Sequence, residues 1–168
     1  MVKLFIGVTG SKEFRRVLGA SIEHVQDLRP AWDQVQKTVE GFQKKVFLNK
    51  GSVGGLSKWK PLADSTQKLK IRDGYAQWST YPLIRTQTLM NAWTKEGSEG
   101  AVRDKQKLYF AFGINEYDIP YADSHQSGIG VPKREHLRLP TSLRNAISRI
   151  IQTYLVKSGQ LVRRNVFR

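Results

Sequence analysis

The sequence contains no cysteine, so a disulfide framework, a thiol nucleophile and a thiolate metal site are all excluded. Its three histidines, His24, His125 and His136, lie far apart and lack the HExxH spacing of a zinc protease. No apolar run approaches the roughly 20 residues that a membrane-spanning helix needs. These absences predict a protein that binds no metal or other cofactor and has no membrane partner.

Acidic residues are also scarce: the chain has 28 Lys and Arg against 14 Asp and Glu, for a net charge of +14. Residues 133–168 contain nine basic residues and one acidic residue, so this segment supplies +8 of that charge. So large an excess of one sign predicts a polyanionic neighbour, either nucleic acid or an acidic face of a partner protein. A surface that serves only solubility is the alternative. The expected contact residues are Arg144, Arg149, Lys157, Arg163, Arg164 and Arg168.

The residue types of a catalytic site are present, but not in a catalytic arrangement. Asp123, Ser124 and His125 are adjacent, and the side chains of neighbouring residues generally point apart rather than converge as a triad requires. No Gly-x-Ser-x-Gly elbow accompanies them. The Gly-rich segment 49–55 is followed by Leu56-Ser57-Lys58, not by the Gly-Lys-Ser/Thr of a phosphate-binding loop. We therefore expect the protein not to be an enzyme.

Hydrophobic periodicity predicts both strands and helices. Residues 2–8 alternate with a period of two, and from 107 to 114 both alternating sets are largely apolar, which is typical of a central strand buried on both faces. Helices are expected at 30–49 and 63–73, from Pro82 onward, and from Pro140 or Thr141 to a stop at Gly159. At 168 residues the chain is long enough for one domain with its own core. We therefore predict a single α+β domain over residues 1–158, in which a small antiparallel or mixed sheet packs with about three or four helices, and a basic tail at 159–168.

Two aromatic features have alternative interpretations. The expected helix at 30–49 carries one apolar stripe, which could face the core or a neighbouring subunit, and the core is favoured. The stripe consists of Trp32, Val35, Val39, Phe42 and Val46. Trp59 lies between Lys58 and Lys60 and could stack on a nucleic-acid base, but an anchor that pins its loop to the core is favoured.

Four short segments occur in an order that is found in a known family. They are Trp59-Lys-Pro-Leu62 with Thr66 and Lys68, Pro82–Leu89, Tyr121–Gly128 and Val131–Leu137. Together they resemble the phage virion morphogenesis proteins, the tail-completion or neck group with its Mu-like and P2-like members. The matching positions are Trp59, Pro61, Leu62, Thr66, Thr86, Leu89, Tyr121, His125, Gln126 and Gly128. Gln87 stands where the family has Gly, and Glu135-His136-Leu137 stand where it has an aromatic residue.

The resemblance implies a structural protein of a tailed bacteriophage that forms a ring, for example a hexamer, at the head–tail junction. DNA would pass through the ring, which would contact other neck, connector or tail proteins. Such a protein belongs to the virion and is assembled in the host cytoplasm. A closed ring needs two different patches on each subunit. From the residues themselves, His125 and Gln126 are expected to fix their loop by hydrogen bonds, with Gly128 allowing the chain to reverse. The alternative function is a stand-alone basic nucleic-acid-binding module.

Overall fold

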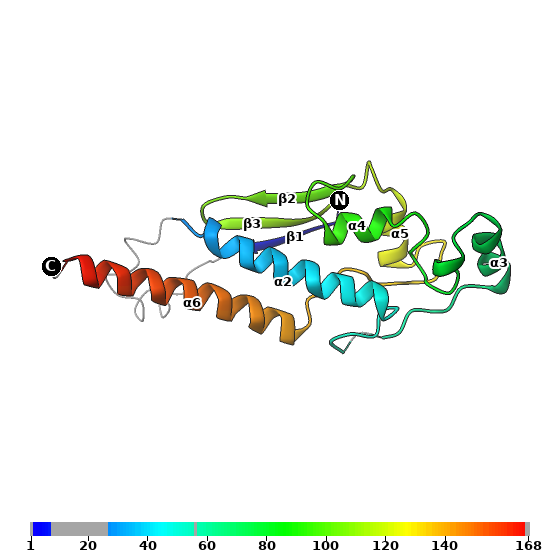
Figure 1. Cartoon of the computed structure of the whole chain (residues 1–168). Coiled ribbons are helices and arrows are strands. Elements are labelled where there is room, and N and C mark those ends of the chain that lie inside the picture. The colour runs from blue at the N-terminus through cyan, green and yellow to red at the C-terminus, as the bar shows by residue number, and fades with distance from the viewer. Residues whose placement is uncertain (1, 8–26, 56, 167–168) are drawn as a thin grey trace.

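The computed structural model describes the backbone of residues 2–7, 27–55 and 57–166, and the side chains of 27–55 and 57–157. Figure 1 shows an elongated molecule in which a sheet lies along two long helices. In chain order the elements are β1 (Val2–Gly7), α2 (Arg29–Leu48), α3 (Asp64–Arg72), the 3₁₀ helix η2 (Ala76–Trp78), α4 (Thr88–Thr94), β2 (Ala101–Lys105), β3 (Tyr109–Ile114), α5 (Tyr121–Ser127) and α6 (Thr141–Val166).

The sheet has three strands in the order β1-β3-β2, and both pairings are antiparallel. This arrangement confirms the predicted small α+β fold, and of the two predicted sheet types it is the antiparallel one. Strand β3 is central, and its residues from Phe110 to Ile114 are buried, as the two apolar sets predicted. Strand β2, which flanks it, was not predicted from the sequence.

Helix α2 lies between the sheet and α6 (Figure 1). Its stripe residues Trp32, Val35, Val39 and Val46 are fully buried, so the stripe faces the core of this chain. Trp32 stacks on Phe110 of β3 and donates its indole N–H to the carbonyl of Gln106 at 2.9 Å. One amphipathic helix thus joins the sheet to the rest of the core.

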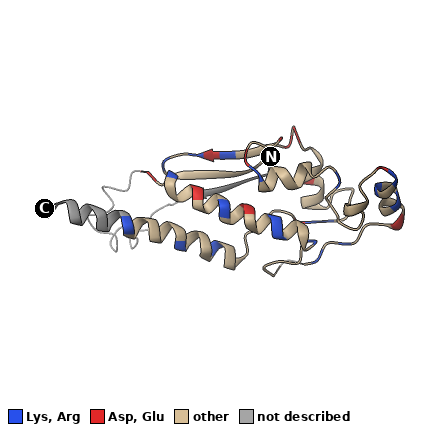
Figure 2. Cartoon of the chain, viewed as in Figure 1, with Lys and Arg blue, Asp and Glu red and all other residues tan. Residues whose placement is uncertain are grey.

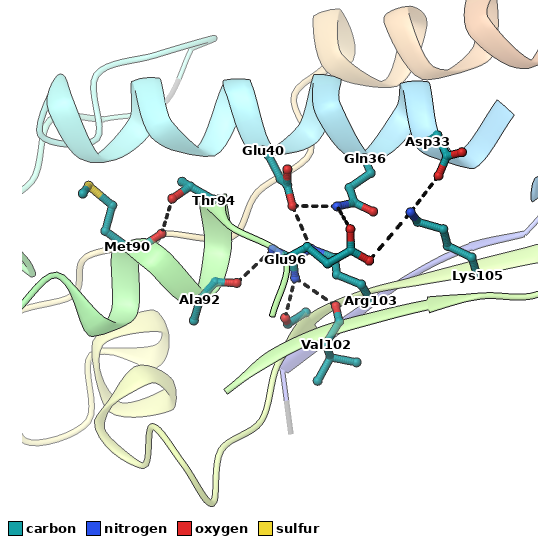
Figure 3. A network of polar contacts seen from close by, with 11 residues as sticks. Asp33, Gln36, Glu40, Met90, Ala92, Thr94, Glu96, Val102, Arg103 and Lys105 are labelled. Atoms are coloured by element: carbon teal, nitrogen blue, oxygen red, sulfur yellow. Dashed lines mark hydrogen bonds and ion pairs between the residues drawn. The ribbon is translucent and has the colours of Figure 1, made fainter. Parts of the chain in front are cut away.

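A buried cation fastens α2 and α4 to the sheet (Figure 3). The guanidinium of Arg103 in β2 is 3.1 Å from a carboxylate oxygen of Glu40 in α2, and it lies over the ring of Phe112 at 3.8 Å. It also donates to the backbone carbonyls of Ala92, Val102 and Gly113. Burial lowers the pKa of Arg103, whereas the hydrogen bond to Glu40 raises it. A charge held by a carboxylate and three carbonyls is well compensated.

Further polar side chains extend this cluster along α2 (Figure 3). The amide of Gln36 donates to Glu40 and Glu96, at 3.0 and 3.1 Å. The ammonium of Lys105 lies 2.7 Å from Asp33 and 3.8 Å from Glu96. Acidic side chains therefore lie next to basic ones where the side chains of α2 meet those of β2.

The structure corrects two predicted helix boundaries. Helix α4 begins at Thr88, not at Pro82, because Leu83 and Gln87 have φ of 60° and 67°, outside the helical region. Helix α6 continues past Gly159 to Val166, so the segment predicted as a tail has a helical backbone as far as that residue. A glycine inside a helix costs only about 1 kcal/mol relative to alanine and need not end it. The described residues form five α-helices, close to the expected number of about three or four.

Candidate functional site

The segments that carry the family resemblance meet around one cavity of about 890 Å³. Residues 60–63 and 83–88 form two of its walls, and Thr66 and Lys70 of α3 lie between them. Tyr121 and His125 of α5 line it too, followed by Pro132 and Arg134. Segments up to about seventy positions apart in the chain thus build a single site, of a size typical of ligand pockets.

Trp59 anchors the first of these segments to the core. Its side chain is 4% exposed and packs edge-on against Phe47, while its indole N–H donates to the carbonyl of Glu135 at 3.0 Å. A Cβ added at Gly51 would lie 2.6 Å from the Trp59 ring, so this approach requires glycine, which also has a φ of 90°. The anchor interpretation of Trp59 is confirmed, and its buried ring has no face free for a nucleic-acid base.

Gln126 holds the third and fourth segments together. Its side-chain oxygen accepts hydrogen bonds from the backbone N–H groups of His136 and Leu137, and its N–H group donates to the Leu137 carbonyl. Gly128 ends α5 with a φ of 84°, and a Cβ there would come within 2.9 Å of Lys133. The predicted roles of Gln126 and Gly128 in shaping this turn are therefore confirmed.

His125 contributes differently from the prediction. Its backbone carbonyl, not its ring, accepts the hydrogen bond that pins the following segment, from the N–H of Arg134 at 2.7 Å. The ring lines the cavity, and its Nδ1 is buried without a hydrogen-bond partner. Burial and then the nearby charge of Arg134 lower the pKa of His125, although the Pro132 carbonyl opposes this. The ring of His125 therefore forms part of the cavity wall, while its Nδ1 is enclosed by the surrounding described residues.

Two buried cations lie in the cavity wall. Lys70 is 6% exposed, and its ammonium donates to the backbone carbonyls of Trp78, Tyr81 and Ile84. Burial, followed by the charges of Arg85 and Arg134, lowers the pKa of Lys70 to about 8. Arg134 is 5% exposed, and the only hydrogen bonds of its guanidinium within the described residues go to the Lys60 carbonyl, at 3.2 and 3.3 Å. Neither cation forms an ion pair with a described carboxylate.

Neither buried cation is among the candidate residues predicted from the sequence. Lys70 lies in a mostly polar segment in which nothing in the local pattern separates it from Lys68, which is exposed. Only the three backbone carbonyls that surround its ammonium distinguish it, and the chain brings them there through η2 and the following turn.

The remaining motif positions lie at the cavity or directly behind it. Pro61, Leu62, Thr66, Thr86 and Tyr121 all line it. The hydroxyl of Thr86 shares a hydrogen bond with that of Thr88 at the start of α4. Leu89 is 1% exposed and belongs to the core cluster behind the wall.

His136, one of the three residues that stand where the resembled pattern has an aromatic residue, lies in the core. It is fully buried, its Nδ1 accepts a hydrogen bond from the Trp93 indole at 3.1 Å, and its Nε2 donates to the Ala122 carbonyl at 2.9 Å. Burial lowers the pKa of His136 to about 4, although the Ala122 carbonyl opposes this. The ring is therefore neutral at physiological pH and serves as a core side chain.

The expected DNA- or partner-binding residues lie apart from the cavity. Arg144, Arg149 and Lys157 are exposed on α6. In Figure 2 all the charged residues on the described part of α6 are basic, whereas α2 carries both basic and acidic residues. Arg163 and Arg164 belong to α6, where the structure describes the backbone alone, and Arg168 lies outside the described residues.

Helix α5 contains Asp123, Ser124 and His125, which are the three residue types of a catalytic triad. Successive helix residues point about 100° apart, and no hydrogen bond joins these three side chains in the described structure. Among the described residues, no group of three or more His, Asp and Glu side chains could hold a metal ion. None of the described helices has the length and apolar character needed to cross a bilayer.

Comparisons of the chain with protein-family models, with curated proteins and with solved structures found no match.

Proposed function

We propose that this chain is a structural protein of a tailed bacteriophage, a neck or tail-completion (terminator) subunit that assembles into a ring at the head–tail junction. One observation carries the proposal: the four segments that resemble this family line one cavity, and hydrogen bonds join three of them. Trp59 bonds to Glu135, and Gln126 bonds to His136 and Leu137, so residues at matching positions hold the segments to one another. Such mutual packing is expected of segments that share one structural role.

In this role the protein acts by shape and charge, with no reaction and no cofactor. The core of α2, α4 and the sheet supplies a rigid body, and the loops at Gly51–Gly55 and Ser127–Pro132 are the proposed contacts to neighbouring subunits or rings. The positive residues of α6 would meet DNA phosphates in the channel or an acidic partner ring. Contact with phosphates alone would be independent of sequence and would weaken with salt.

The decisive test is the mass of the purified full-length protein in solution over a wide range of concentration. The proposal expects a discrete ring, either alone or upon mixing with tail tubes or portal complexes, and electron microscopy of assembled particles should place it at the head–tail junction. A protein that stays monomeric at high concentration and joins neither tail tubes nor portal complexes would contradict the proposal.

The exposed positive residues of α6 favour a second candidate, a stand-alone nucleic-acid-binding module. That function predicts tight DNA binding by the monomer, steeply weakened by salt and lost when Arg144, Arg149, Arg163 and Arg164 are replaced by glutamine. The ring proposal instead predicts weak binding by the monomer, because the charges are concentrated only on assembly. Salt-dependent binding measurements on monomer and ring fractions separate the two.

A further inference from the structure

The cavity between α3, α4 and α5 is positively charged and lacks a counterion. Lys60, Lys70, Arg85 and Arg134 line it, and no Asp or Glu is among the described residues that do so. Arg85 is paired outward with Asp73. Lys70 and Arg134 are more than nine-tenths buried and have no carboxylate partner in the described structure. Because buried charges are normally paired, this wall is suited to an anion that comes from elsewhere.

Donor groups remain available inside the cavity. Arg134 uses its Nε and Nη2 on the Lys60 carbonyl, and its Nη1 makes no hydrogen bond within the described residues. Three cations close enough for Arg85 and Arg134 to lower the pKa of Lys70 repel one another, and an anion among them would relieve that repulsion.

The rest of the lining is mainly apolar, which narrows the class of ligand. Pro61, Leu62, Leu83 and Pro132 contribute apolar surface beside the charged groups. A duplex phosphate backbone is read by exposed cations along a surface, not by two buried cations inside a cavity of about 890 Å³. A carboxylate that has an apolar side chain beside it matches both the charges and the walls.

The backbone of the cavity wall is strained at two positions. Leu83 and Gln87 both line the cavity and have φ of 60° and 67°, where side chains other than glycine are disfavoured. Strain of this kind persists where the surrounding structure enforces it, and it is concentrated at ligand-binding sites.

From these observations we propose that the cavity is a docking site for an acidic peptide segment of a protein partner, one that presents an Asp, a Glu or a chain-terminal carboxylate next to an apolar side chain. The carboxylate binds Arg134 and lies near Lys70 and Lys60, and the apolar neighbour packs on Leu62 and Pro132. This inference deepens the proposed function and rests on it for the role of the partner, since it states the chemistry by which an adjoining subunit would be recognised.

The test selects a displayed library of random heptapeptides on the full-length protein and measures the affinity of the recovered peptides by fluorescence anisotropy. The expected peptides carry Asp or Glu next to Leu, Phe or Tyr, and they lose binding when the acid is replaced by its amide. A recovered motif that matches the chain's own Glu116-Tyr117-Asp118, whose tyrosine is 84% exposed, would assign the segment to a neighbouring copy. Any other acidic motif would assign it to a different protein.

Matched variants locate the binding. Lys58 and Lys60 are both exposed and two residues apart, but only Lys60 lines the cavity. Lys60→Gln should weaken binding about threefold to fivefold, and Lys58→Gln should leave it unchanged. Arg134→Gln should weaken peptide binding about thirtyfold or more. If that buried variant does not fold, the comparison of Lys60→Gln with Lys58→Gln still tests the proposal.

Three outcomes overturn the inference: no peptide is retained, the retained peptides lack an acid, or Lys58→Gln and Lys60→Gln bind them equally. Displacement by inorganic phosphate as effective as by the free peptide would also overturn it, by showing a simple anion site. Because binding is measured on the isolated protein and ring formation by its mass, the docking site and the proposed function can fail separately.

Discussion

Two regions of this molecule bury cations, and they do so in opposite ways. On the sheet side, Arg103 has Glu40 as its counterion at 3.1 Å, and more acidic side chains surround it (Figure 3). On the cavity side, the partners of the Lys70 and Arg134 side chains among the described residues are backbone carbonyls alone. The first region satisfies its charge within the chain and therefore serves the fold. The second leaves an excess of positive charge facing an open space, as a recognition site requires.

The two regions are connected by stacked rings. Arg103 lies over Phe112, Phe112 stacks on Trp93, and Trp93 bonds to His136 in the segment that bears Arg134. The two regions thus belong to one packed core, and substitutions in either region test the difference between them.

The largest expected effect is at Arg103. Replacing it by methionine leaves the carboxylate of Glu40 half-buried without its cation and removes the donors from three backbone carbonyls, so the free energy of unfolding should fall by about 3–5 kcal/mol. Chemical denaturation measures the change. Lys105→Met, which removes a more exposed ion pair on the same strand, should cost less than about 1 kcal/mol. If the two variants lose the same free energy of unfolding, the Arg103 cluster stabilises the fold no more than an exposed ion pair does.

The next effect is the pH dependence of stability caused by His136, which joins the two regions. Its pKa is about 4 in the folded protein and 6.5 when unperturbed, so between these values the unfolded chain binds a proton that the folded chain does not. The free energy of unfolding should therefore fall as the pH falls from about 6.5 to 4, by about 3 kcal/mol in total.

Urea denaturation over this pH range tests the prediction, with His136→Phe as the control. Removal of the titrating ring should flatten the slope between pH 6.5 and 5, where few carboxylates titrate, even though the variant loses the two hydrogen bonds of His136. A variant with the same slope as the natural chain would assign the pH dependence to other groups.

A smaller effect should follow from placing an acid in the cavity. Thr66→Glu puts a carboxylate beside the uncompensated cations and should stabilise the protein by about 1 kcal/mol at low salt, with the gain shrinking as salt rises. Ser65→Glu is the matched control: Ser65 lies in the same first turn of α3, with a similar helix-dipole effect, but it is exposed and does not line the cavity. If the two variants have equal thermal midpoints, the cavity has no unbalanced positive charge.

The smallest effect concerns the strain in the cavity wall. Gln87 has a φ of 67°, so Gln87→Gly relieves an unfavourable conformation but also loosens the unfolded chain, for a net gain of about 0.5 kcal/mol. Gln87→Ala keeps the strain and should change stability little. Differential scanning calorimetry on the three proteins checks the order, and a glycine variant less stable than the alanine variant would refute the assignment of strain.

Local patterns predicted the elements whose residues repeat with a clear period. The stripe from Trp32 to Val46 and the doubly apolar run to Ile114 identified α2 and the central strand, because burial imposes a 3.6-residue or two-residue period on such elements. Strand β2 was missed because its residues Val102 and Arg103 lie in a polar setting with no alternation, and its place is set by hydrogen bonds to β3. The start of α4 was misplaced because Pro82 is compatible with a helix start, whereas the φ of Gln87 is not visible in a sequence.

The amino-acid sequence by itself determined the class of fold and the turn at Gly128, since these depend on residue type and on local patterns, and it favoured the anchoring role of Trp59 without naming the distant Glu135 that Trp59 bonds to. Only the tertiary structure decided which cations are buried, that Arg103 is paired with an acid while Arg134 has none among the described residues, and that segments from Lys60 to Arg134 enclose one cavity. The reason is physical: the environment of a charge depends on groups far away in the chain, which become its neighbours only when the core packs.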